Sequence, residues 1–68
     1  MNEETFNLSI RKFLKMVGVN SQHQLEQAVA KAIADGSITG TEALAAKVTL
    51  EVAGLKLNAT FDGEIKLQ

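Results

Sequence analysis

The sequence predicts an α+β fold, in which a two-helix hairpin packs on one face of a small antiparallel β-hairpin or three-stranded meander (order α-α-β-β(-β)). Apolar residues recur at helical spacing as far as residue 35, and from residue 44 they alternate with polar ones. Glycines mark the change between the two patterns. A chain of 68 residues is expected to form one small domain, residues 1–68, whose apolar faces cover one another.

The first helix is expected over about residues 3–17. Asn2 can cap it, and Glu3 and Glu4 suit its positive N-terminal end. Its apolar stripe consists of Phe6, Ile10, Phe13, Leu14 and Val17. Gly18 is expected to end the helix as a C-terminal residue with positive φ.

The second helix is expected over about residues 22–35. Ser21 and Gln24 have the spacing of a capping box, and Asp35-Gly36 is expected to end the helix. Its apolar stripe consists of Leu25, Ala28, Val29, Ala32 and Ile33. Val19 then lies at the corner between the two helices.

The corner at residues 18–21 resembles the turn of a DNA-binding helix-turn-helix, but the pattern after it differs. In that motif the residues six and nine positions past the turn glycine are apolar, whereas here they are Gln24 and Gln27. The apolar Leu25 and Ala28 come one position late, which rotates the helix by about 100°. A capped hairpin corner therefore explains the stretch better.

Two strands are expected over about residues 44–52 and 55–67, joined by a two-residue turn at Ala53-Gly54. This turn places Val48 opposite Ala59, and on the polar face it places Glu51 opposite Lys56. We favour a bend near residue 63 within one long strand, with a three-residue loop and a third strand as the alternative. Residues 41–46 have helical propensity, so they could begin as a helical turn capped by Thr41.

Three stretches, "FNLSIRKFLKMVGVNSQHQLEQAV", "ITGTEALAAKVTLEVAGLKL" and "GEIKL", resemble a family of small proteobacterial proteins, a domain of unknown function. The resemblance covers nearly the whole chain and implies a single domain of similar length in a bacterial, cytosolic protein. Caps, stripes and strands carry this resemblance, so it assigns no catalytic or binding residue.

Catalytic and metal chemistry is not expected. The chain has no cysteine, which excludes disulfides and thiolate metal sites. His23, the only histidine, can offer a metal no more than a pair with Glu26, and zinc needs three or four ligands. Asp35 and Asp62 each precede a glycine, where turn chemistry explains them. We therefore expect no catalytic residue, no metal site and no cofactor.

Composition also bears on location and partners. No apolar run approaches the roughly 20 residues of a membrane span, and the absence of cysteine fits the cytoplasm. The net charge of −1 gives no general attraction to nucleic acid. One surface is nevertheless a candidate interaction site, because it combines cations with apolar side chains: Leu8, Arg11, Lys12, Lys15 and Met16.

We therefore expect a protein–protein interaction module that binds an unknown protein partner or a second copy of itself. A two-stranded sheet is marginal alone, and its outer edges offer unpaired backbone groups. Two copies could pair edge to edge in a homodimer, or the edge could accept a strand from another protein. The alternative function is weak nucleic-acid binding through Arg11, Lys12 and Lys15, which would depend on salt.

Overall fold

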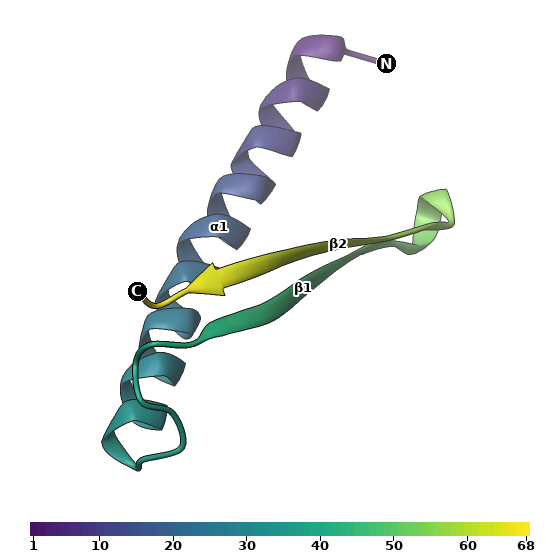
Figure 1. Ribbon diagram of the computed structural model, residues 1–68. Coiled ribbons are helices and arrows are strands. Elements are labelled where there is room, and N and C mark those ends of the chain that lie inside the picture. Colours follow the sequence, from purple (N-terminus) through teal and green to yellow (C-terminus); the bar gives the residue numbers. More distant parts are fainter. The chain divides into compact units, whose positions relative to one another are not determined.

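The computed structural model describes residues 1–68 and shows one helix followed by one β-hairpin (Figure 1). The elements are α1 (Glu3–Ala34), β1 (Ala43–Val52), the short 3₁₀ turn η1 (Ala53–Leu55) and β2 (Leu57–Lys66). Residues 1–37 and residues 38–68 form two compact units, which are described separately.

The predicted two-helix hairpin is wrong, because α1 is one continuous helix of 32 residues. Gly18 does not end it, and Ser21 is not a cap. A glycine inside a helix costs about 1 kcal/mol relative to alanine, which the many good helix formers around it can offset. Asn20, a residue typical of turns, instead donates from its side-chain Nδ2 to the carbonyl oxygen of Met16 at 2.9 Å.

Both predicted outer ends of the helical region are confirmed. The Asn2 side chain accepts a hydrogen bond from the Thr5 amide at 2.9 Å. At the other end Gly36 has φ +80°, and its amide donates to the Ile33 carbonyl at 3.2 Å. The Ser37 amide donates to the Ala32 carbonyl at 2.9 Å. This pair of bonds is a Schellman motif, and the positive φ is the reason that glycine is favoured at this position.

The hairpin unit is a two-stranded antiparallel sheet. Its register differs by two residues from the predicted one: Val48 lies opposite Phe61 rather than Ala59, and Glu51 lies opposite Asn58 rather than Lys56. An even shift keeps every side chain on its predicted face, since the side-chain period of a strand is two. The alternation therefore predicts the faces but cannot fix the pairing.

The connection between the strands accounts for the shift. Four residues, 53–56, join the strands instead of two. Lys56 ends this loop in the left-handed region with φ 51°, and its amide donates to the Ala53 carbonyl at 3.1 Å. Four-residue loops built on such a turn are common in hairpins. The sequence offers glycine at position 54, but the left-handed residue is a lysine.

The structure also excludes two alternatives for the ends of the sheet, a third strand and a helical turn before the first strand. β2 continues through Gly63, which pairs with Ala46 in the unbroken ladder, so the third strand is wrong. Strand β1 begins at Ala43, so the helical turn over residues 41–46 is wrong as well. A bond from the Leu67 amide to the Glu42 carbonyl at 3.1 Å extends the pairing beyond β1.

Candidate interaction surface

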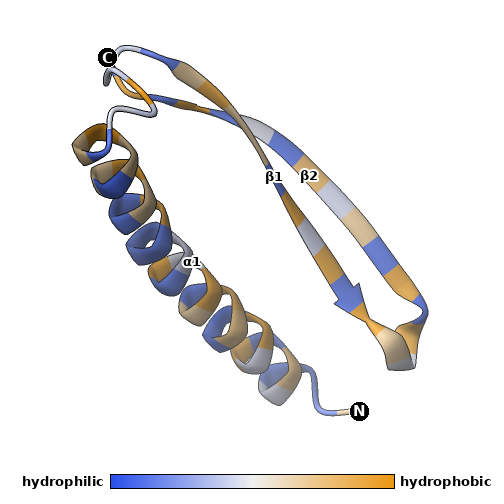
Figure 2. Ribbon diagram, turned by 90° about the horizontal axis from the view of Figure 1, so that it is seen from below, coloured by the Kyte–Doolittle hydropathy of each residue, from blue (hydrophilic) through white to orange (hydrophobic).

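The apolar residues of α1 form one stripe that continues along the helix. Both predicted stripes have the same phase, because Leu14 and Leu25, or Val17 and Ala28, are eleven residues apart, close to three full turns. Figure 2 shows the hydrophobic colours along one side of α1. We call this surface the helix stripe: Phe6, Ile10, Phe13, Leu14, Val17, Ser21, Leu25, Ala28, Val29, Ala32 and Ile33.

The helix stripe is not buried. Its most covered members, Val17, Ser21, Val29 and Ala32, are half-buried, and the others are exposed. Phe6, for example, is 48% exposed to solvent. Neither the helix unit nor the hairpin unit buries a side chain by itself. Within the helix unit the stripe is therefore an exposed apolar face of the kind that folded proteins normally cover.

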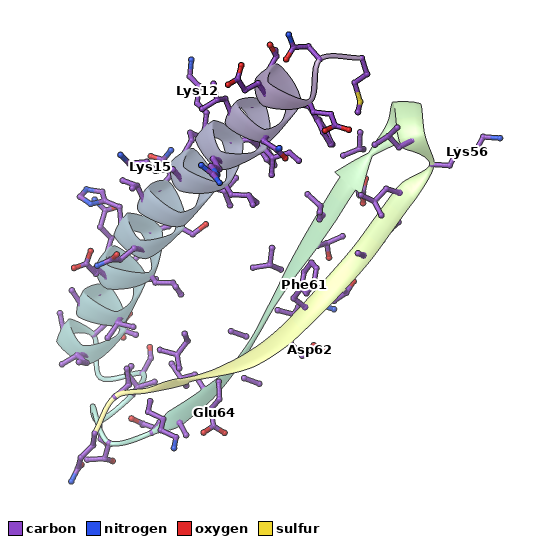
Figure 3. The ribbon with its side chains drawn as sticks, turned by 90° about the horizontal axis from the view of Figure 1, so that it is seen from above. Lys12, Lys15, Lys56, Phe61, Asp62 and Glu64 are labelled. Atoms are coloured by element: carbon purple, nitrogen blue, oxygen red, sulfur yellow. The ribbon has the colours of Figure 1, made fainter.

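The hairpin also has one apolar face. Adjacent side chains leave a strand on opposite sides, as Phe61 and Asp62 do in Figure 3. Val48 and Phe61, which oppose each other on the apolar face, are 52% and 62% exposed. The face comprises Leu44, Ala46, Val48, Leu50, Val52, Leu57, Ala59, Phe61 and Ile65.

The surface predicted from the basic residues lies on the other side of α1. The continuous helix brings Leu8, Arg11, Lys12, Lys15 and Met16 together, and all five side chains are exposed. Lys12 and Lys15 extend outward from this side in Figure 3. This surface has only two apolar side chains, Leu8 and Met16, whereas the helix stripe has apolar side chains along its whole length.

A compact anion-binding turn, which the sequence analysis missed, precedes β1. The Glu42 carboxylate accepts three backbone N–H bonds: from Thr39 at 2.8 Å, from Gly40 at 2.9 Å and from Thr41 at 3.0 Å. Gly40 has φ +99°, which turns its amide toward the carboxylate. The hydrogen bond from the Thr39 amide is the largest cause that lowers the pKa of Glu42 to about 2, and the amides of Glu42 itself, Gly40 and Thr41 add to it.

The turn after α1 has a smaller relative of this arrangement. The Asp35 carboxylate accepts from both the hydroxyl and the amide of Ser37, the amide at 2.9 Å. The hydroxyl bond first, and then the amide bond, lower the pKa of Asp35. Asp35 thus acts as a local turn residue, as predicted from its position before a glycine.

The remaining polar groups lie apart from one another on α1 and on the hairpin. No group of three or more His, Cys, Asp and Glu side chains is placed to hold a metal ion, so His23 and Glu26 gain no further ligand. A hollow of about 260 Å³ lies on the hairpin, lined by Ala45, Ala46, Lys47 and Asp62. In α1, no stretch is both sufficiently long and sufficiently apolar to pass through a membrane.

Comparison with known proteins gives one match. No curated protein and no solved structure matches the chain. A family model described as "Family of unknown function (DUF6494)" matches residues 1–68, the whole of the sequence. The chain therefore belongs to this family of unknown function, as its caps, stripe and strands led us to expect.

Proposed function

We propose that this protein is an interaction module that associates with further copies of itself through its apolar faces, and that it acts by contact rather than by catalysis. The observation that carries the proposal is that each of the two units, taken by itself, has an apolar face that it does not bury, in a chain that is 46% hydrophobic. Continuous exposed apolar surface marks binding surfaces in soluble proteins.

Each unit by itself supports this proposal. Most of the stability of a protein helix comes from packing its apolar face, so a lone 32-residue helix with an exposed stripe lacks its main source of stability. A lone two-stranded hairpin is at best marginally stable in water. A second copy supplies apolar surface to both units, and association then stabilises the folded state by mass action.

We also propose that the protein works in the bacterial cytoplasm. The likeness to small proteobacterial proteins supports this location, and a chain without cysteine fits a reducing compartment. Within this proposal its partner is a second copy of the same protein.

A pair of matched substitutions tests the proposal. Ile10 belongs to the helix stripe and is 38% exposed, whereas Leu8 lies on the opposite, basic side of α1 and is 63% exposed. Ile10→Asp and Leu8→Asp introduce the same charge into the same helix, two residues apart. A charge buried in an apolar contact is costly, so Ile10→Asp should abolish association and Leu8→Asp should leave it nearly unchanged.

The readout is co-purification of a tagged copy with an untagged copy, checked by light scattering. Loss of association in Leu8→Asp alone would assign the contact to the basic surface and contradict the proposal. Wild-type copies that never co-purify at millimolar concentration would also contradict it.

A further inference from the structure

We propose that α1 pairs with α1 of a second copy in antiparallel orientation, with Phe6 opposite the partner's Ala32 and Ile10 opposite the partner's Ala28. This inference rests on the proposed self-association and adds its orientation and register. Two residues face each other in this pairing when their numbers sum to about 38, so the two-fold axis passes near the middle of α1.

The distribution of side-chain size along the helix stripe favours this orientation. The N-terminal half has no alanine and includes Phe6, Ile10 and Phe13, whereas the C-terminal half has Ala28 and Ala32 beside larger side chains, which are Leu25, Val29 and Ile33. An antiparallel pair places large residues against small ones, so the two helices can keep an even separation. A parallel pair would place phenylalanine on phenylalanine at one end and alanine on alanine at the other.

The register sets four pairs of helix-stripe residues opposite one another, and it leaves three stripe members opposite polar residues: Leu14 opposite Gln24, Val29 opposite Ser9 and Ile33 opposite Thr5. Besides Phe6 with Ala32 and Ile10 with Ala28, it sets Phe13 opposite Leu25 and Val17 opposite Ser21. The stripe extends from Phe6 to Ile33, a length of about 40 Å at 1.5 Å per residue. The contact therefore uses nearly the whole helix.

The helix dipoles favour the same orientation. In an antiparallel pair the positive N-terminal end of one helix lies beside the negative C-terminal end of the other. Two parallel helices would place like ends together, where their dipoles repel.

Spin-label distances test the orientation directly. The chain has no cysteine, so Thr5→Cys and His23→Cys, both outside the helix stripe, each give a single label site. In the antiparallel pair the two Thr5 positions are offset along the axis by about 42 Å and the two His23 positions by about 12 Å. We therefore expect a label separation above about 40 Å at Thr5 and below about 30 Å at His23.

A dimer with similar short separations at both sites would overturn the antiparallel pairing and leave the proposed self-association standing. Absence of any dipolar coupling between labels, together with a monomeric mass, would instead contradict the self-association itself. These two failures are therefore distinguishable in one experiment.

A size-exchange experiment tests the register. Ile10→Ala removes a large residue that faces Ala28, and we expect the dimer to dissociate at least about tenfold more readily. Adding Ala28→Ile to the same chain exchanges the two partners symmetrically, so the affinity should return to within about threefold of the wild type. A double variant that is no tighter than Ile10→Ala would contradict this register.

Discussion

Val48 lies directly opposite Phe61 in the ladder of β1 and β2. In the same register Lys47 is opposite Asp62, which matches unlike charges on the polar face. We expect cross-strand nuclear Overhauser effects between the backbone protons of Val48 and Phe61. The tight turn suggested by the sequence would instead pair Val48 with Ala59, so direct backbone contacts between those two residues would contradict the four-residue loop.

The loop itself is tested by two glycine substitutions of opposite kind. Lys56 is a non-glycine residue with φ 51°, a conformation that costs roughly 1 kcal/mol. Lys56→Gly should therefore raise the free energy of unfolding of the hairpin by about 0.5–1 kcal/mol. The measurement is urea unfolding followed by hairpin-specific resonances.

Gly54→Ala is the matched control for that change. Gly54 has no positive φ, and an added Cβ there meets nothing within 4 Å. Alanine should be neutral at this position or slightly stabilising. Destabilisation by Gly54→Ala, with no gain from Lys56→Gly, would show that the two-residue turn forms in solution.

Gly18→Ala tests the continuity of α1. Because Gly18 is inside the helix with open space around it, alanine should increase helix stability by about 1 kcal/mol. Far-ultraviolet circular dichroism and thermal unfolding measure this gain. Gly36→Ala provides the contrast: Gly36 has φ +80°, so alanine there should destabilise by about 1 kcal/mol. A loss of helix in Gly18→Ala would support a helix end at residue 18.

Glu42 predicts a pH dependence of the turn before β1. Its pKa falls from the ordinary 4.5 to about 2 in the folded chain. The carboxylate therefore stabilises the turn fully above about pH 4.5, and this contribution is lost as the pH falls from 4.5 toward 2. Carbon-detected NMR of the Glu42 carboxyl should give an apparent pKa near 2.

The variant Glu42→Gln serves as the control for this titration. Its side chain cannot ionise, so the amide shifts of Thr39, Gly40 and Thr41 should no longer change between pH 4.5 and 2. A Glu42 titration midpoint near 4.5 in the wild type would show that the three amides do not hold the carboxylate.

Sequence patterns predicted the two outer ends of the helical region correctly, but they wrongly predicted a break inside it. Asn2 and Gly36 were identified correctly because a cap and a C-terminal glycine act through bonds to their immediate neighbours. The corner at Gly18 was predicted wrongly, because glycine, asparagine and serine are typical of turns but do not forbid a helix. The common phase of Val17 and Ala28 was the signal that the helix continues.

The hairpin shows the same limit in another form. Alternation predicts which side chains share a face, but registers that differ by two residues satisfy it equally well. The left-handed Lys56 determines the pairing, and residue type gives no indication of that conformation. The Glu42 turn was missed for a similar reason, since three amides converge only once Gly40 has φ +99°.

Sedimentation equilibrium of the unmodified chain, from micromolar to millimolar concentration, tests the central claim most directly. Because neither unit buries its own apolar face, we expect the average mass to rise with concentration from 7.3 kDa toward twice that value. The unfolding temperature should rise over the same range. A mass that stays at 7.3 kDa throughout, with a cooperative unfolding transition that does not depend on concentration, would contradict self-association.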